Sequence, residues 1–273
     1  MTEKIRNPDA RRSAIQRQLL LDGSVNVETL AKELGVSVAT IRRDLTALED
    51  DGAVRRTHGG ATATTPRGAD QAFALREQID SEAKRMIART AFKLIETDQT
   101  LFMNDGSTVL ALARELQASG ISLTVATPGV NIATTLSESP CIDAYLAGGL
   151  VRHKTRGTAG DFVEQMLSQI NADVAFIAAE GFSLQEGLTF SYEADAKIAR
   201  IMNQKASQTV ILATARKLGQ RDRMTSIPIS KVDILITDCG DEAVISSFRE
   251  LGISVIVASN IEYGINNLHI FSA

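Results

Sequence analysis

Seven short apolar segments alternate with helical segments through most of the chain. The apolar segments are residues 100–104, 122–126, 142–147, 174–179, 208–213, 233–237 and 253–258. Helical periodicity appears between them, at residues 108–118, 130–137, 161–170, 193–206 and 241–251. This alternation indicates an α/β domain with a mostly parallel sheet covered by helices on both faces. We expect one long amphipathic helix before it, starting near residue 71 or 79 and ending near residue 95.

The first sixty residues follow a different pattern, in which three short helices precede a hairpin. We expect helices from about residue 9 to 21, from 27 to 34 and, after an N-cap at Ser37, up to residue 50. Gly35 suits a tight turn between the second and third helices. Residues 53–61 have the pattern of a β-hairpin with a glycine-rich turn. Two short helices joined by a turn like the one at Gly35 place the second helix in the major groove of DNA, and the hairpin would form a wing beside it. We therefore predict a winged helix-turn-helix.

The third helix carries the residues that we expect to read DNA. Ile41 and Leu45 share its inward face, so Arg42 and Arg43 must point outward. An arginine that pairs with guanine contributes about 1–3 kcal/mol of discrimination, although the pattern leaves open which of the two reads a base. We expect Asp44 to orient an arginine. The predicted DNA-binding residues are Ser37, Thr40, Arg42, Arg43, Arg55, Arg56 and His58. The alternative is a plain three-helix bundle with a solvated basic face.

A net charge of −4 is unusual for a DNA-binding protein, but the charge is distributed unevenly between the N-terminal region and the rest of the chain. Residues 1–67 hold 11 of the 29 Lys and Arg and 9 of the 33 Asp and Glu, which leaves +2 there and −6 in the remainder. The cations cluster in three pairs, at residues 11–12, 42–43 and 55–56. An acidic second domain would keep non-specific DNA affinity low.

The small and polar stretch at residues 61–69, ATATTPRGA, is the expected linker. We therefore predict a DNA-binding domain at residues 1–62, a linker at 63–78 and an effector-sensing and oligomerisation domain at 79–273. The polar start and the lack of a long apolar run predict a cytoplasmic protein with no membrane partner. Two cysteines and three scattered histidines show no ligand spacing, so we expect no metal. No P-loop, GxGxxG or GxSxG pattern occurs, so we expect no cofactor and no catalytic residue.

The loop at residues 104–108, Asn-Asp-Gly-Ser-Thr, follows a predicted strand and opens a predicted helix. Helix N-termini attract anions, and Gly106 would let a phosphate approach the backbone closely. In an open α/β sheet ligands collect at the carboxyl ends of strands. Loops at residues 126–131, 147–149, 180–181 and 214–217 should occupy the same edge. Capping of the helix alone, or a solvated charge at Lys217, would explain the same residues without a ligand.

The segment LAKELGVSVATIRRDLTALEDDGAVRRTHGGA at residues 30–61 resembles the DNA-binding region of DeoR-type transcription regulators. The resemblance continues more loosely through most of the chain. It implies a C-terminal domain similar to ribose-5-phosphate isomerase that senses phosphorylated sugars or sugar alcohols. It also implies that residues 105–108 bind phosphate, that Lys217 belongs to a second ligand loop, and that residues 187–193 form a third.

We accordingly expect a regulator, most simply a repressor of a carbohydrate catabolic operon, that binds operator DNA as a homo-oligomer. The predicted effector-binding residues are Asp105, Gly106, Ser107, Thr108, Thr127, Gly149, Glu193 and Lys217. Three segments depart from the family pattern: residues 127–129, residues 180–182, and Thr214, where the family has an aspartate. The alternative is an isomerase-like enzyme fused to a DNA-binding module, with Asp105, Glu180, Glu193 and Asp238 as conceivable acids and bases.

Overall fold

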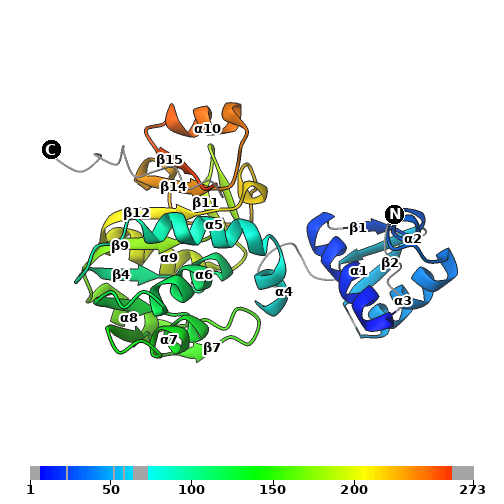
Figure 1. The fold of residues 1–273 in the computed structure, drawn as a ribbon, viewed down its shortest axis with the longest axis horizontal. Helices are drawn as coiled ribbons and strands as arrows, with labels where there is room; N and C mark the ends of the chain where they lie inside the picture. The colour runs from blue at the N-terminus through cyan, green and yellow to red at the C-terminus, as the bar shows by residue number, and fades with distance from the viewer. Residues whose placement is uncertain (1–6, 23, 52, 58, 64–72, 260–273) are drawn as a thin grey trace. The chain divides into compact units, whose positions relative to one another are not determined.

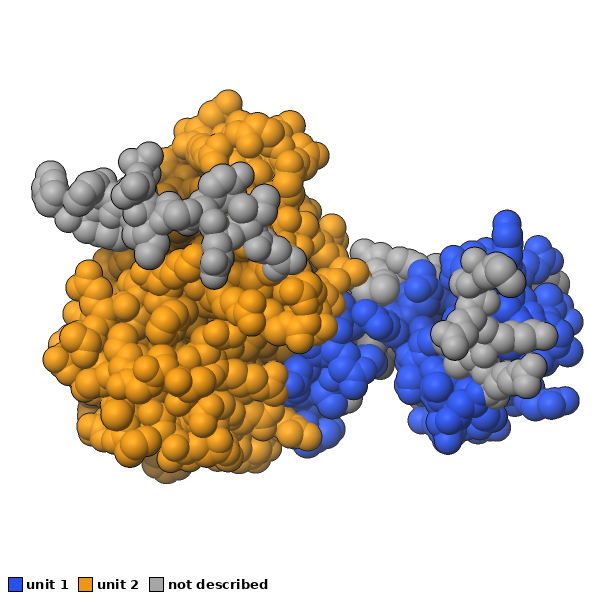
Figure 2. Space-filling view, in the orientation of Figure 1, with its two compact units in different colours: residues 1–79, 153–155 blue, residues 80–152, 156–273 orange. Residues whose placement is uncertain are grey.

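The computed structural model describes residues 7–22, 24–51, 53–57, 59–63 and 73–259. The chain divides into two compact units, one comprising residues 1–79 and 153–155 and the other residues 80–152 and 156–273 (Figure 2). Each unit has its own hydrophobic core.

Four helices and a small sheet form the described part of the first unit. Its elements are α1 (Pro8–Asp22), β1 (Ser24–Asn26), α2 (Val27–Glu33), α3 (Val38–Asp50), β2 (Val54–Thr57), β3 (Gly60–Ala63) and α4 (Phe73–Gln78) (Figure 1). Ile15, Ile41 and Leu45 are fully buried where α1 packs against α3. The predicted helix-turn-helix and hairpin are confirmed. The hairpin also gains β1 as a third strand, because β3 lies between β1 and β2.

Two predicted boundaries in this part of the chain are wrong. Residues 61–63, assigned to the linker, belong to β3, where Ala61 and Thr62 pair with both neighbouring strands. The helix expected to start near residue 71 or 79 and to end near residue 95 is α5 (Ser81–Phe92), which is close to the later start, whereas the earlier start includes a separate helix, α4. Asp80 separates them with a φ of 51°, a left-handed conformation that aspartate tolerates better than most residues. Helical periodicity continues across that break, so it could not reveal it.

The second unit is built on a seven-stranded sheet in which every pair of neighbours is parallel. Its strands are β4 (Thr100–Met103), β5 (Leu123–Thr127), β6 (Ile142–Leu146), β9 (Ala172–Ile177), β12 (Ala206–Leu212), β14 (Ile234–Thr237) and β15 (Ser254–Val257). All seven predicted strands are present. Their order is β15-β14-β12-β9-β4-β5-β6.

Helices cover the sheet as the alternation predicted. They are α6 (Ser107–Gln117), α7 (Val130–Leu136), α8 (Asp161–Ser168), α9 (Glu193–Lys205) and α10 (Glu242–Arg249). Helices α5, α6 and α7 pack side by side, and α8 packs against α9. Figure 1 shows α5 and α6 in front of the strands. Because the chain winds outward from β4 in one direction and from β9 in the other, the strand order reverses between these two strands. Such a reversal is where open α/β sheets bind ligands.

Two small antiparallel sheets were not predicted. One joins β10 (Gly181–Ser183), β11 (Gly187–Phe190) and β13 (Met224–Thr225), and the other is the hairpin of β7 (Leu150–Val151) and β8 (Thr158–Ala159). Phe182 of β10 stacks on Phe248 of α10 with ring centroids 4.9 Å apart, so the first sheet is anchored in the main core. Each strand of these small sheets follows the strand before it through a loop or a 3-10 turn, so the alternation of strands and helices that predicted the main sheet does not mark them.

Candidate functional site

The capping residue of α3 behaves as the sequence predicted. Ser37 Oγ accepts a hydrogen bond from the Thr40 backbone N–H at 3.2 Å and lies 2.9 Å from Thr40 Oγ1. A side-chain oxygen at this position satisfies a backbone donor that the helix itself leaves unpaired. The N-terminus of α3 is therefore fixed, and the two hydroxyls that could meet a DNA phosphate lie there together.

The predicted reading residues of α3 lie on its exposed side. Ile41, Leu45 and Leu48 are buried on the opposite side, whereas the Arg42 and Arg43 side chains are exposed. Hydrophobic packing therefore orients the helix so that both arginines face solvent.

The wing residues behave differently from one another. Arg55 is exposed, whereas Arg56 donates from Nη1 to Thr46 Oγ1 at 3.2 Å and from its backbone N–H to Glu49 Oε1 at 3.1 Å. The wing is thus fastened to α3 through Arg56. His58 lies outside the described residues.

Asp44 orients an arginine, but its partner is Arg11 of α1 and neither member of the Arg42–Arg43 pair. Arg11 Nε and Nη2 donate to the two carboxylate oxygens at 2.5 and 3.1 Å. Only 7% and 6% of the two side chains are exposed. The hydrogen bond that Arg11 donates to Asp44 raises the pKa of Arg11. This bidentate pair locks α1 to α3, so Arg11 is not available as a DNA-facing cation, contrary to the grouping of residues 11 and 12 as a surface cluster.

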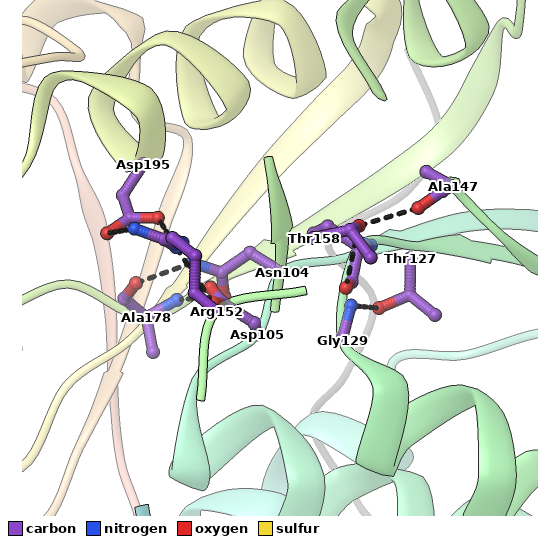
Figure 3. A network of polar contacts seen from close by, with 10 residues as sticks. Asn104, Asp105, Thr127, Gly129, Ala147, Arg152, Thr158, Ala178 and Asp195 are labelled. Carbon is purple, nitrogen blue, oxygen red and sulfur yellow. Dashed lines mark hydrogen bonds and ion pairs between the residues drawn. The ribbon is translucent and has the colours of Figure 1, made fainter. Parts of the chain in front are cut away.

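The carboxyl ends of β4 and β9 are joined by a buried asparagine. Asn104 Nδ2 donates to the Ala178 carbonyl at 2.8 Å, and the Ala178 N–H donates to Asn104 Oδ1 at 3.0 Å (Figure 3). These bonds hold the two loops together at the point where the strand order reverses. A Cβ added at Gly106 would lie 2.7 Å from Ala178 Cβ, so the loop after β4 needs glycine for this close packing.

The loop at residues 105–108 forms the N-terminus of α6. Gly106 is the N-cap, in an extended conformation, and no side chain caps the helix. Asp105 and Ser107 are partly buried, and Thr108 is buried. The positive end of the helix dipole therefore faces the point between β4 and β9 where the strand order reverses, which we call the switch point. This favours a negative group there.

The β7–β8 hairpin is fastened over this edge of the sheet. Thr158 Oγ1 donates to the carbonyls of Ala147 and Pro128 at 2.6 and 3.0 Å, and the Val130 N–H donates to the Arg156 carbonyl at 2.9 Å. Thr127 Oγ1 accepts from the Gly129 N–H at 3.0 Å. The loops after β5 and β6 are thus tied to the hairpin (Figure 3).

Arg152 lies at the centre of this arrangement, and the sequence did not single it out. Its Nη1 donates to Asp195 Oδ2 at 3.0 Å, its Nη2 pairs with Asp195 Oδ1, and its Nη2 lies 3.4 Å from Asp105 Oδ2 (Figure 3). Desolvation lowers the pKa of Arg152, but the Asp195 hydrogen bond and the charges of Asp195, Asp105 and Glu180 outweigh it and raise the pKa. The guanidinium therefore remains charged while largely buried.

One sequence signal could have identified Asp195. It precedes Ala199 and Met202 by four and seven residues, the spacing of one helix face, and both are buried. A carboxylate on an apolar helix face must find a buried cation or hydrogen-bond donor. Nothing comparable marks Arg152, which lies in an irregular loop.

The remaining predicted effector residues lie at different places along the same edge. Gly149 has a φ of 153°, and a Cβ there would lie 2.7 Å from the Ala159 carbonyl oxygen, so it serves the hairpin. Glu193 is the exposed first residue of α9, two residues before Asp195. Lys217 ends a short 3-10 turn after β12 and is partly buried. The structure therefore gathers Asp105, Gly106 and Thr127 around the switch point and places Lys217 beyond β9.

Comparison with known proteins agrees with both units. Residues 11–67 match the model of the DeoR-like helix-turn-helix domain, and residues 79–239 match that of the DeoR C terminal sensor domain. None of the helices that the structure describes has the length and apolarity to cross a membrane.

Several curated relatives are similar over most of their length. HTH-type transcriptional regulator GolR of Listeria innocua is 32% identical over 253 residues, 92% of this chain and 99% of that protein. HTH-type transcriptional regulator GlpR of Haloferax volcanii is 34% identical, covering 78% of this chain and 83% of that protein. Among solved structures, ribose 5-phosphate isomerase A of Methanocaldococcus jannaschii has a TM-score of 0.39 at 17% identity, covering 51% of this chain and 55% of that one. By the two family matches and these relatives, the chain belongs to the DeoR family of DNA-binding transcription regulators.

Proposed function

We propose that this regulator represses a carbohydrate catabolic operon and leaves its operator when a phosphorylated sugar or sugar alcohol binds. The chain through the end of β3 would bind double-stranded DNA in the cytoplasm, the segment between β3 and α5 would link the two domains, and the domain from α5 onward would sense the effector and oligomerise. The observation that carries the proposal is the buried polar network at the switch point, because a domain that only scaffolds a DNA reader needs no such site.

In this proposal α3 lies in the major groove. Arg42 and Arg43 would contact a base edge and a phosphate, and Ser37 and Thr40 would meet phosphate at the helix N-terminus. Arg55, Arg56 and His58 would contact the sugar-phosphate backbone through the wing. A symmetric operator requires at least two copies, with half-sites about one helical turn or a multiple apart.

The effector would bind with its phosphate at the N-terminus of α6. Gly106, Ser107 and Thr108 supply backbone N–H groups and hydroxyls, and Arg152 supplies a nearby guanidinium that can pair with phosphate in a bidentate manner. The hydroxyl groups of the sugar would meet four polar side chains and the backbone of one glycine along the same edge. These residues are Asp105, Thr127, Gly149, Glu193 and Lys217.

The structure offers less support for the isomerase alternative. A general base must be able to reach a substrate proton. Asp105 faces the Arg152 guanidinium, and Asp238 Oδ1 accepts a hydrogen bond from the Ala215 N–H at 2.7 Å. Both of these carboxylates therefore have protein partners, and the charge of Glu180 also acts on Arg152. The relatives GolR and GlpR carry the names of transcriptional regulators.

The proposal is tested by binding the full-length protein to duplex DNA from its own upstream region and to a scrambled duplex at physiological salt. We expect preference for the native sequence, and release by one or a few compounds from a panel of sugar and polyol phosphates. A thermal shift of the full chain identifies the compound independently, because a ligand that binds only the folded state raises Tm. Equal affinity for both duplexes, or isomerisation of a panel compound at ordinary enzyme rates, contradicts the proposal.

The variant Ser107→Ala separates the two activities. We expect it to weaken the response to the identified compound and to leave DNA affinity unchanged, since Ser107 lies in the sensor unit. An unchanged dose response would remove the residue 105–108 loop from the effector site.

A further inference from the structure

Exposed apolar side chains are concentrated at one edge of the sensor unit. Seven large hydrophobic side chains are exposed in the described part of the chain, and five of them lie within eighteen consecutive residues. These five are Tyr145, Leu146, Leu150, Val151 and Phe162, with exposed fractions of 52%, 41%, 74%, 57% and 76%. We call them the edge patch. Because five exposed apolar side chains gather around one strand, we read this edge of the sheet as an interaction site.

The edge patch lies around β6, the terminal strand of the seven-stranded sheet. Tyr145 and Leu146 belong to β6 itself, and Leu150 and Val151 form β7. Phe162 and Leu150 each adjoin one of two residues that are in close contact. A Cβ added at Gly149, just before Leu150, would lie 2.9 Å from Cγ2 of Val163, just after Phe162. The hairpin and the start of α8 are therefore neighbours, and Figure 1 shows β7, α7 and α8 gathered at this end of the sheet.

The outer side of β6 offers backbone groups for pairing. The Ala147 N–H donates to the Thr127 carbonyl, and the Cys141 carbonyl accepts from the Leu123 N–H. The backbone N–H and C=O groups of the odd-numbered residues of β6 therefore point towards β5. The N–H and C=O groups of Ala144 and Leu146 face outward, because these directions alternate along a strand. Within the described residues no strand pairs with this side. An exposed apolar edge strand is a template for another strand.

We propose that a second copy of this chain covers the edge patch, with the two β6 strands antiparallel across a two-fold axis at Ala144. Ala144 then faces its own copy and Ile142 faces Leu146 of the other chain, all through outward-facing backbone groups. This register also keeps the two Asp143 carboxylates from lying directly opposite each other. It opposes Asp143 to Tyr145, whereas an axis at Asp143 would place two carboxylates directly opposite each other, which is destabilising. None of the five patch residues is charged.

This assignment rests on the proposed function, since a symmetric operator needs two copies related by a two-fold axis. It goes further by specifying the surface and the register. The pairing would join two seven-stranded sheets edge to edge and would bury the edge patch of both chains.

The test is the mass of the full-length protein by sedimentation equilibrium at micromolar concentration. The wild-type chain of 29.4 kDa should sediment as a dimer or a multiple of one. The double variant Leu150→Glu, Phe162→Glu should have half the wild-type mass, so that a dimer becomes a monomer and a tetramer becomes a dimer. The matched control is Leu251→Glu, since Leu251 is 49% exposed but follows α10, away from β6. The control should keep the wild-type mass.

Two further variants test the register. Ala144→Pro removes an outward N–H and no hydrogen bond to β5, although it also restricts the backbone. It should dissociate the assembly too, and circular dichroism checks that the variant is folded. Ala144→Cys in a Cys141→Ser background should form an intermolecular disulfide, because directly opposed residues of a hydrogen-bonded antiparallel pair have Cα atoms about 5.5 Å apart.

A wild-type monomer, or patch variants that keep the wild-type mass, would overturn the assignment. In the second case specific operator binding would still stand, so failure of the interface and failure of the proposed function are distinguishable. In that case the two copies would associate through another surface, or the edge patch would bind a different protein.

Discussion

Arg152 and Asp195 are 43 residues apart in the sequence and form a largely buried, bidentate ion pair at the carboxyl edge of the sheet. The pair joins the β7–β8 hairpin to helix α9. It also sets the charge of the predicted effector site, because Asp105 lies within 3.4 Å of the same guanidinium. A phosphate bound at the N-terminus of α6 would compete with two carboxylates for Arg152.

We expect Arg152→Gln to weaken the effector response at least tenfold and to destabilise the fold. Removing one member of a buried pair leaves the other charge uncompensated, at a cost of about 3–5 kcal/mol. The replacement Arg152→Lys should recover part of the stability but little of the response, because lysine cannot pair with phosphate in a bidentate manner. Urea unfolding and effector titration measure the two effects separately. A wild-type titration for Arg152→Gln would exclude Arg152 from the effector site.

Gly157 is predicted to be a position where a single methyl group disturbs the effector site. A Cβ at Gly157 would overlap Asp105 Oδ2, whereas nothing lies within 4 Å of a Cβ at Gly148. Overpacking of this kind costs about 1–3 kcal/mol. Gly157→Ala should therefore lower Tm and weaken the effector response, and Gly148→Ala should resemble the wild type in both. Equal behaviour of the two variants would show that the hairpin can move away from Asp105 without loss.

Asp44→Asn should destabilise the DNA-binding unit, since it removes the buried carboxylate that pairs with Arg11 and lies 3.9 Å from Arg12 Nε. We expect a loss of about 3–5 kcal/mol. Asp50→Asn, on an exposed carboxylate of the same helix, should change the unfolding free energy by less than about 0.5 kcal/mol. The double replacement Arg11→Met with Asp44→Leu should recover most of the stability, because apolar side chains can fill the site without a desolvation penalty. Failure of the double variant to recover would point to a packing role for this arginine beyond the ion pair.

Arg43→Ala should reduce operator affinity while the protein stays folded, because its side chain is exposed. A contact to a base costs about 1–3 kcal/mol when lost and relaxes preference at one position. A phosphate contact instead weakens binding to all sequences and lowers the salt dependence by about one unit of slope. Binding titrations at several salt concentrations distinguish the two. The control is Arg223→Ala, an exposed arginine of the sensor unit, which should bind operator as the wild type does.

The two glycines of the wing should differ sharply in their tolerance of alanine. A Cβ at Gly60 would overlap the Val25 carbonyl oxygen of β1, whereas the nearest atom to a Cβ at Gly59 is Asn26 Nδ2 at 3.8 Å. Gly60→Ala should therefore lower Tm and DNA affinity together. Gly59→Ala should leave Tm unchanged. If Gly59→Ala weakens DNA binding at unchanged Tm, the wing backbone approaches the DNA closely at that residue.

The sequence alone was sufficient for the helices of the DNA-binding unit, for the strands of the main sheet and for the buried face of α3. The spacing of Ile41 and Leu45 predicted which side of α3 is buried, and the N-cap at Ser37 followed from its side chain. The seven strands were predicted because each is an apolar run between helices. These are short-range properties, since a helix period or a capping hydroxyl depends only on residues within about one turn.

Tertiary structure decided which distant residues meet. The partners of Asp44 and Asp195 come from other elements, and although helical spacing places each aspartate on a buried face, it does not say which cation it meets. Gly60 and Gly157 look like ordinary loop glycines, and their need for glycine comes from Val25 and Asp105, each more than thirty residues away in the chain. The sequence therefore determined the elements and their buried faces, whereas only the folded chain brought Arg152 to Asp105 and Asp195, because burial of opposite charges depends on the packing of whole elements.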